Sequence, residues 1–299
     1  MSTPNGVMAG APALAQGRGR GGTLWPTLRA IYIIWYRDVL RFWRDRARLA
    51  ASFAQPLLYL LIFGTGLSSA LSGAGGFGGP GAPAGFSYTQ FIFPGIMGMS
   101  VLFSSMFAAV SIVWDREFGF LKEVLVAPID RSAVAIGKAL GGATQAMVQG
   151  LILLLLAPFV GVKLTLVSVL TLIPLVFLLA FALSAMGVAI ASRMRSMQGF
   201  QMVMNFLVMP MFFLSGALFP LAGLPAWMTV LTRIDPTAYG IDPLRRVVLE
   251  GAGMPAQALD RMSLTIGGGP VPIIVEAGIL LAFGIAVLAI AVRNFRVRD

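Results

Sequence analysis

The chain contains no cysteine and no histidine. Disulfide bonds, thiolate catalysis and cysteine-ligated metals are therefore excluded, as are the commonest metal ligand and the usual general base near neutral pH. A G-x-x-x-x-G-K-[ST] phosphate loop is also missing, because Gly137-Lys138-Ala139 lacks both the leading glycine spacing and the hydroxyl residue. We predict no catalytic residue, no metal site and no cofactor bound by this chain itself.

Charge is scarce as well, at 11% of residues, whereas hydrophobic residues make up 58% and the mean hydropathy is +0.86. Several segments approach or exceed the roughly 20 apolar residues that a helix needs to span a bilayer. The sequence therefore predicts an all-α polytopic membrane protein with six transmembrane helices. They are expected over 49–71, 90–114, 134–159, 164–192, 199–219 and 271–292.

The basic residues are distributed unevenly between the predicted loops. Eight lie before the first span, four in 116–138, two at 193 and 195, and three in 293–298, which is 17 of the 22 in the chain. Lysine and arginine accumulate on the cytoplasmic side of membrane proteins. We predict a multi-pass membrane protein with both termini in the cytoplasm. This bias explains the net charge of +10 without a nucleic-acid partner.

Two segments outside the spans have a distinctive composition. Residues 1–23 are Gly/Ala/Arg-rich and are predicted to form a disordered cytoplasmic tail. Residues 24–48 carry apolar side chains at helical spacing with arginines on the other side, which predicts an amphipathic helix at the bilayer interface. That helix either anchors the chain only, or also transmits motion or gates lateral access. Residues 49–299 form the predicted six-helix transmembrane domain.

A third segment, 221–250, contains semi-apolar pieces that are each too short to cross a bilayer. Pro225, Pro236 and Pro243 interrupt them. Short helices of this kind are typical of re-entrant segments, where irregular backbone is shielded by protein. We predict an external re-entrant segment before the last span.

Few ionisable residues fall inside the spans, where Glu276 is expected near the outer interface and Lys138 near the cytoplasmic end. A proton-coupled pump normally needs carboxylates buried at mid-membrane. An ion- or proton-coupled secondary transporter is therefore an alternative that the sequence disfavours. A membrane-bound lipid-modifying enzyme is a further alternative, for which Asp235, Asp242 and Arg245 are the nearest approach to a catalytic cluster. We expect these three residues to cap or anchor short helices.

Uncharged polar residues and methionines occur at helical spacing in the third and fifth spans. Such amides either join helices or line a solute path, and thioethers adapt to varied apolar ligands. The candidates for a substrate path are Gln145, Gln149, Gln201, Asn205, Met209 and Phe213. In the third span, Gly137-x-x-x-Gly141 also predicts the close approach of another helix.

The loop 115–132 concentrates the charge that the rest of the chain lacks. A solvated connection with inside-positive charge would explain its basic residues. It would not explain four acidic residues combined with apolar residues at helical spacing. A helix acidic at its start and apolar on one face is suited to insertion into a groove of another protein. The residues predicted to dock are Asp115, Arg116, Glu117, Phe118, Gly119, Leu121, Glu123, Pro128 and Arg131.

Two motifs resemble those of the membrane subunits of type-2 ABC exporters, a family that includes daunorubicin-resistance, nodulation-factor and polysaccharide-export permeases. The first runs Asp115-Arg116-Glu117-Phe118-Gly119, followed by Leu125, Pro128, Arg131 and Gly137-Lys138. The second spans 210–220 and continues through Leu224-Pro225, Trp227, Asp235-Pro236, Tyr239 and Leu244-Arg245.

The resemblance implies a dimer, most simply a homodimer, of six-helix subunits surrounded by the lipids of the bacterial cytoplasmic membrane. Together with the distribution of basic residues, it predicts a multi-pass protein with both termini in the cytoplasm. It also implies that the loop is a coupling helix for two copies of a separate ATPase subunit, which bind the ATP and Mg. The cargo implied is a drug, lipid or glycolipid, that is, a hydrophobic or amphipathic solute moved out of the cytoplasm. Phe120 and Lys122 stand where many members have Thr and Glu. That departure resembles the drug-resistance branch and points to multidrug efflux and antibiotic resistance.

Overall fold

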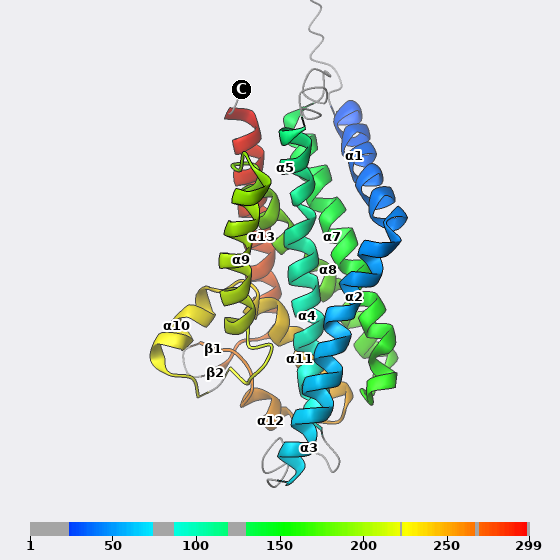
Figure 1. The fold of residues 1–299 in the computed structure, drawn as a ribbon. Coiled ribbons are helices and arrows are strands. Elements are labelled where there is room, and N and C mark those ends of the chain that lie inside the picture. Colours follow the sequence, from blue (N-terminus) through cyan, green and yellow to red (C-terminus); the bar gives the residue numbers. More distant parts are fainter. Residues whose placement is uncertain (1–23, 74–86, 119–129, 222, 267–268, 298–299) are drawn as a thin grey trace, which may run out of the picture.

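The computed structural model describes residues 24–73, 87–118, 130–221, 223–266 and 269–297 (Figure 1). These residues are almost entirely helical, and six of the helical segments are long and apolar enough to cross a membrane. The predicted all-α polytopic fold is therefore confirmed. In the described part of the chain, the strands are the two-residue pair β1 (Thr265–Ile266) and β2 (Gly269–Pro270), which are antiparallel. The predicted tail over 1–23 lies outside the described residues.

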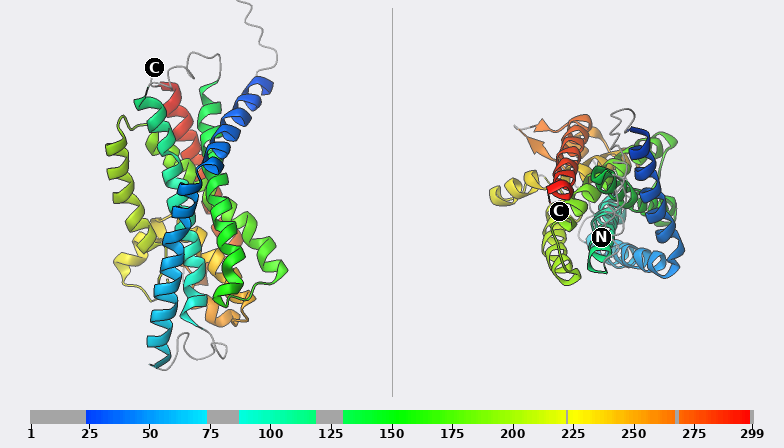
Figure 2. Two further views of the ribbon diagram at one scale, coloured as in Figure 1. Left: turned by 45° about the vertical axis from the view of Figure 1, so that its right-hand side comes forward. Right: turned by 90° about the horizontal axis from the view of Figure 1, so that it is seen from above.

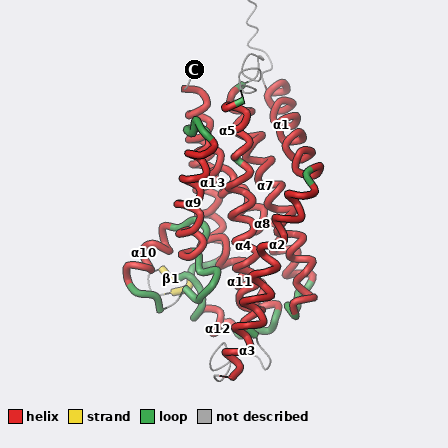
Figure 3. The backbone as a smooth tube through the Cα atoms, in the orientation of Figure 1, coloured by secondary structure: helices red, strands yellow, loops and turns green. Residues whose placement is uncertain are grey.

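Figure 3 shows that helices make up most of the described residues. The first half of the chain contains α1 (Leu24–Arg44), α2 (Arg46–Tyr59), the π-helix η1 (Leu60–Thr65), α3 (Gly66–Gly73), α4 (Tyr88–Ala108), α5 (Val110–Glu117) and α7 (Arg131–Leu156). The second half contains the 3₁₀-helix η2 (Ala157–Val160), α8 (Leu166–Ala191), α9 (Met197–Leu214), α10 (Ala226–Ile234), α11 (Ala238–Gly251), α12 (Ala256–Asp260) and α13 (Ile273–Val297).

The helix boundaries differ from the predicted ones by a few residues, for local reasons. α4 begins at Tyr88 because Ser87 and Gln90 form a capping box, in which each side chain pairs with the other residue's backbone N–H. α9 ends five residues before the predicted boundary, and Gly216 follows with a φ of 75°, a conformation that ends helices. α13 instead continues five residues past the predicted end, because arginines near a helix C-terminus are compatible with its dipole.

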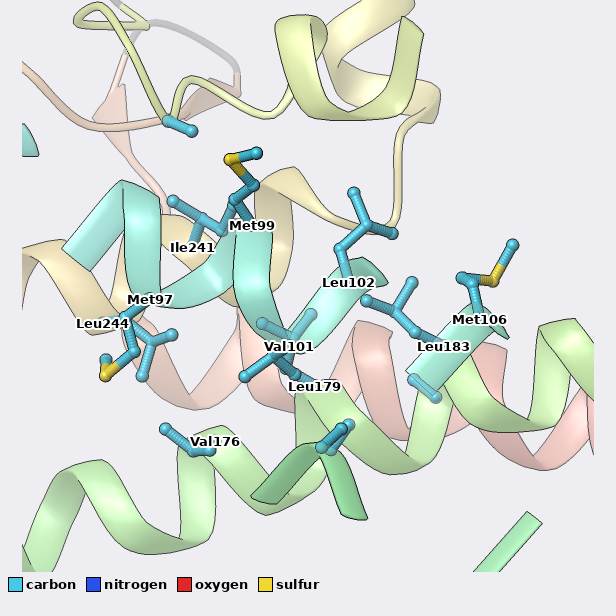
Figure 4. Close-up of a cluster of buried hydrophobic side chains, with 14 of the residues drawn as sticks. Met97, Met99, Val101, Leu102, Met106, Val176, Leu179, Leu183, Ile241 and Leu244 are labelled. Atoms are coloured by element: carbon cyan, nitrogen blue, oxygen red, sulfur yellow. The ribbon is translucent and has the colours of Figure 1, made fainter. Parts of the chain in front are cut away.

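The core of the bundle is formed where α4, α7, α8 and α13 pack together. Figure 4 shows buried side chains of α4, such as Met97 and Leu102, beside Leu179 and Leu183 of α8. Ile241 of α11 belongs to the same cluster and is fully buried. The expected short helices before the last span are thus present, and α11 packs against α4, α8 and α13. Their depth in a bilayer stays a prediction.

The two ends of the bundle differ in which elements they hold. The start of α1, the end of α5, the start of α7 and the end of α13 lie together at one end, whereas α3 and α12 lie at the other (Figures 1 and 2). We call the first the basic end, because it carries the arginines of α1 and of the α13 C-terminus. α1 runs alongside α7 there (Figure 2, left). Whether α1 also lies at the bilayer interface stays a prediction.

The contact between α1 and α7 depends on two glycines. A Cβ atom on Gly137 would lie 2.9 Å from the Ile34 side chain, and one on Gly141 would lie 3.1 Å from Cβ of Asp38. Trp35 Nε1 donates a hydrogen bond to Thr144 Oγ1 at 2.9 Å along the same contact. Small residues let helix backbones approach closely. The close approach predicted from Gly137-x-x-x-Gly141 is confirmed, and α1 is the partner helix.

Replacing Gly137 with leucine should therefore push α1 away from α7. We expect Gly137→Leu to lower the free energy of unfolding by about 1–3 kcal/mol, the usual cost of overpacking. Thermal unfolding of the purified protein in detergent measures this. Gly278→Leu on α13 is the matched control, because no atom lies within 4 Å of a Cβ placed there. Equal melting temperatures for the two variants would contradict the close contact.

Candidate functional site at the basic end

Four charged side chains meet inside the basic end of the bundle. Lys138 Nζ of α7 lies 3.2 Å from Asp38 Oδ2 of α1 and 3.0 Å from Asp115 Oδ2 of α5. Arg37 NH2 lies 3.3 Å from the same Asp115 oxygen. Lys138 Nζ also donates to Ser111 Oγ at 3.0 Å. These four residues, Arg37, Asp38, Asp115 and Lys138, are the charge cluster, and they join α1, α5 and α7.

The charge cluster is stable because it contains two positive and two negative groups. The Lys138 side chain is only 2% exposed, and a buried ammonium group needs both a counter-ion and hydrogen-bond acceptors. Sequence reasoning did not find Asp38. A signal was present, because Ala30, Ile34, Asp38 and Phe42 follow one another at intervals of four and all are buried. A carboxylate that interrupts a buried helical stripe must have a partner.

The two residues that follow Asp115 bind other parts of the same end. Arg116 NH1 donates to the backbone carbonyls of Ser192 and Met194, between α8 and α9. Glu117 Oε2 accepts a hydrogen bond of 3.1 Å from the backbone N–H of Met197 at the start of α9. A carboxylate at this position satisfies an otherwise unpaired helix N–H and complements the helix dipole.

Asp115, Arg116 and Glu117 were predicted to dock a partner protein, but their side chains contact other elements of this chain. Phe118 differs, since it is 74% exposed and its ring lies 5.4 Å from that of Trp114. Arg131 opens α7 and donates to the Phe295 carbonyl near the end of α13 at 3.5 Å. The remaining predicted residues, Gly119, Leu121, Glu123 and Pro128, lie outside the described residues. The docking role of the whole set stays a prediction.

A cavity of about 370 Å³ opens next to the charge cluster, between α1, α4, α5, α7 and α9. Its lining residues are Asp38, Arg41, Phe42, Asp45, Phe107, Ala108, Val110, Ser111, Trp114, Gln145, Met197 and Gln201. A second concave region of about 460 Å³ is lined by Arg37, Leu40, Arg41, Arg44 and Asp45. Of the six residues predicted for a substrate path, the structure brings Gln145 and Gln201 together in the first cavity.

The other four predicted path residues lie elsewhere. Gln149 is buried and its Nε2 donates to the Ser52 carbonyl at 2.7 Å, so it joins α7 to α2. Asn205, Met209 and Phe213 are exposed on α9 and do not line the cavity. Gln145 has both of the roles considered for such an amide. It lines the cavity, and it also joins α7 to α1 by donating to the Asp38 carbonyl at 3.4 Å.

A second buried polar group lies toward the other end of the bundle. Arg246 NH2 is 2.8 Å from Asp242 Oδ2 and 3.5 Å from Glu276 Oε1, and Asp242 Oδ2 also accepts from the Leu264 N–H. Glu276 was expected at the interface, but its side chain is fully enclosed by protein. Glu276 does lie in the first turn of α13, and its depth in a bilayer stays a prediction. Its partner was not predicted, because the guanidinium that balances Glu276 comes from α11, whose position the sequence does not give.

The residues weighed as an alternative catalytic cluster serve the fold instead. Asp235 Oδ1 accepts from the Thr237 N–H at 2.9 Å, just before α11. Arg245 donates to the Gly216 carbonyl, and its guanidinium lies 4.7 Å from the centre of the Phe91 ring. Asp235, Asp242 and Arg245 are each at most 5% exposed, so a substrate would not reach them. Their predicted capping and anchoring roles are confirmed.

Removing the lysine from the charge cluster should destabilise the protein strongly. In Lys138→Met, two carboxylates keep one arginine between them, and we expect a loss of about 3–5 kcal/mol in the free energy of unfolding. Adding Asp115→Asn restores equal numbers of charges and should recover part of the loss. Thermal unfolding in detergent measures both, with the exposed Lys163→Met as the matched control. A melting temperature for Lys138→Met equal to that of the control would contradict the assignment.

Asp235 should make stability depend on pH, because burial raises its pKa from 3.8 to about 7. The folded state then holds a proton that the unfolded state releases, so stability falls as pH rises from about 4 to about 7 and is level above that. Asp235→Asn keeps the cap oxygen and lacks the charge. We expect it to exceed the unsubstituted protein in stability by up to about 4 kcal/mol at about pH 8, and to match it at about pH 4. Unfolding curves of both proteins that keep a constant separation across this range would refute the shift.

Comparison with known proteins places this geometry in a family context. Residues 29–249, which include the charge cluster and most of α11, match the family described as ABC-2 type transporter. The chain is similar to the putative transport permease ycf38 of Cyanophora paradoxa, with 26% identity over 73% of each chain. It is similar to nodulation protein J of Rhizobium leguminosarum bv. trifolii, with 27% identity over 77% of this chain and 83% of the relative. The inner membrane transport permease YadH of Escherichia coli K12 is 26% identical over 86% and 91% respectively.

Proposed function

Because this chain belongs to the ABC-2 type transporter family, we propose that it is the permease subunit of an ATP-driven exporter. Two copies of the chain would form the permease and two copies of a separate ATPase subunit would supply energy from the cytoplasm. The cargo would be a hydrophobic or amphipathic solute. In this proposal the basic end faces the cytoplasm of a bacterial cell, in agreement with the side on which basic residues accumulate.

The observation that carries this proposal is the set of contacts made by three consecutive residues at the end of α5. Asp115 binds α7 through Lys138, Arg116 binds the connection between α8 and α9, and Glu117 binds the start of α9. The segment 119–129 begins directly afterwards. A partner that displaced this segment would therefore pull on several helices at once, and the exposed Phe118 is well placed to meet it.

The cavity supports a route for the solute from the cytoplasmic side. It lies beside α5 and α9 and combines aromatic side chains with the amides of Gln145 and Gln201. Cavities of roughly 300–1,000 Å³ with a few polar groups are typical of small-molecule sites. ATP-driven movement of α5 and α9 would change the shape of this cavity and release the solute toward the other end of the bundle.

The exposed side of α9 is the surface we assign to the second permease copy. It is apolar, with Met202 68%, Phe206 82% and Phe213 51% exposed. Close packing of such a face against an identical copy would bury it and bring the two cavities to the centre of the assembly.

The test of this proposal uses inside-out vesicles that contain this chain together with a separate ATPase subunit encoded by a neighbouring reading frame. ATP-dependent uptake of an amphipathic dye, absent without either subunit, is the expected result. Uptake by this chain alone, driven by a proton gradient without ATP, would overturn the proposal and favour a secondary transporter.

Glu117 tests the coupling itself. In Glu117→Ala the Met197 N–H loses its acceptor, so we expect transport per ATP hydrolysed to fall about tenfold while membrane insertion is unchanged. Glu117→Gln keeps an acceptor oxygen and should retain most of the coupling. The exposed Glu250→Ala, near the other end of the bundle, is the control. Unchanged coupled transport in Glu117→Ala, and in a double variant that also replaces Gly119, would contradict the coupling role assigned to Glu117.

A further inference from the structure

The two concave regions at the basic end form one surface, because Arg41 and Asp45 line both of them. The inner part presents more apolar than polar surface, and it combines Phe42, Phe107 and Trp114 with the polar side chains of Ser111, Gln145 and Gln201. The outer part consists almost entirely of charged side chains from the last two turns of α1 and the residue that follows it. A ligand that fills the whole surface must therefore be apolar at one end and charged at the other.

The sign of the ligand's charge can be inferred from the net charge of the residues that line the surface. The charge cluster balances itself, with two positive and two negative groups, so Arg37 and Asp38 contribute little net charge to the cavity. Outside the cluster, the rim holds Arg41 and Arg44 against the single carboxylate of Asp45. The surface thus keeps a positive excess where its polar end opens.

The arginines are arranged so that they can act together. Arg37, Arg41 and Arg44 follow one another at intervals of four and three residues, which places them on one side of α1. The Arg41 guanidinium lies 5.9 Å from the centre of the Trp114 ring, so this residue marks the border between the charged and aromatic parts. Guanidinium groups bind phosphate oxygens in pairs of parallel hydrogen bonds, and they repel a cationic head group.

We propose that this surface binds an anionic amphiphile. Its phosphate, or a head group of similar charge, would lie between Arg41 and Arg44, and its apolar part would lie on Phe42, Phe107 and Trp114. The inference rests on the proposed function, since it names the chemical class of the solute that enters the permease. It selects against cationic amphiphiles, which the motif around Phe120 and Lys122 left open.

The binding experiment uses the full chain in nanodiscs of phosphatidylcholine, with empty nanodiscs subtracted. The probe is radiolabelled dodecyl phosphate, and the competitors are dodecyltrimethylammonium and inorganic phosphate. We expect saturable binding of dodecyl phosphate that weakens as ionic strength rises. Neither competitor should displace it at equal concentration. Displacement by dodecyltrimethylammonium would overturn the anionic preference, and displacement by inorganic phosphate would overturn the role of the apolar part.

Substitutions at the rim connect this binding to the named residues. Arg41→Gln/Arg44→Gln should weaken dodecyl phosphate binding at least about tenfold, because both charge-assisted partners are lost. Arg29→Gln lies on the same helix outside the cavity and should leave binding unchanged. Should the double variant fail to fold, Arg44→Gln alone, at the exposed last turn of α1, gives a smaller loss in the same direction. Unchanged affinity in the folded variants would overturn the proposal.

A membrane phospholipid and an exported solute share this chemistry, and a further measurement distinguishes them. In the complex with the ATPase subunit, an exported solute raises the rate of ATP hydrolysis, whereas a resident lipid leaves the rate unchanged. Binding of dodecyl phosphate to a complex that shows no ATP-driven transport of this probe or of the amphipathic dye would refute the exporter and keep the site. ATP-driven transport without binding of dodecyl phosphate would refute the site and keep the exporter.

Discussion

The ammonium group of Lys138, held between Asp38 and Asp115, is the interaction on which the basic end of the bundle depends. A lysine buried to this degree is unfavourable unless oppositely charged groups surround it. Meeting that requirement fixes the positions of α1 and α5 relative to α7. These three helices contribute residues to the cavity together with α4 and α9, and α5 also carries Arg116 and Glu117 to the α8–α9 connection. The charge cluster therefore positions one side of both the cavity and these contacts.

The membrane spans could be predicted from the sequence, because apolar length is a local property that each segment carries by itself. The capping residues Ser87 and Ser196 are local as well and determine where their helices begin. The charge cluster could not be predicted in the same way. Lys138 and Asp38 are separated by 100 residues, and no sequence feature near either residue indicates that the other is its partner.

The candidate site shows the same division between local and distant information. Gln145 and Gln201 were recognised as polar residues on apolar helices, and both line the cavity. The arginines of α1 were recognised only as the polar side of an amphipathic helix, since their position beside Trp114 depends on how α1 packs on α7. The surroundings of Glu276 are the clearest example of what could not be predicted. Its burial depends on Arg246, which comes from a helix interrupted by proline and too short to be placed by hydropathy.

The wide spacing of the charge cluster along the chain has a consequence for biosynthesis. Asp38 leaves the ribosome 100 residues before Lys138 does, and Asp115 leaves 23 residues before it. During that interval Arg37 is the cluster's sole basic member, so α1 and α5 cannot yet adopt their final neutral arrangement. The third span thus completes the basic end when it arrives, because only then does Lys138 of α7 supply the charge that joins α1 and α5.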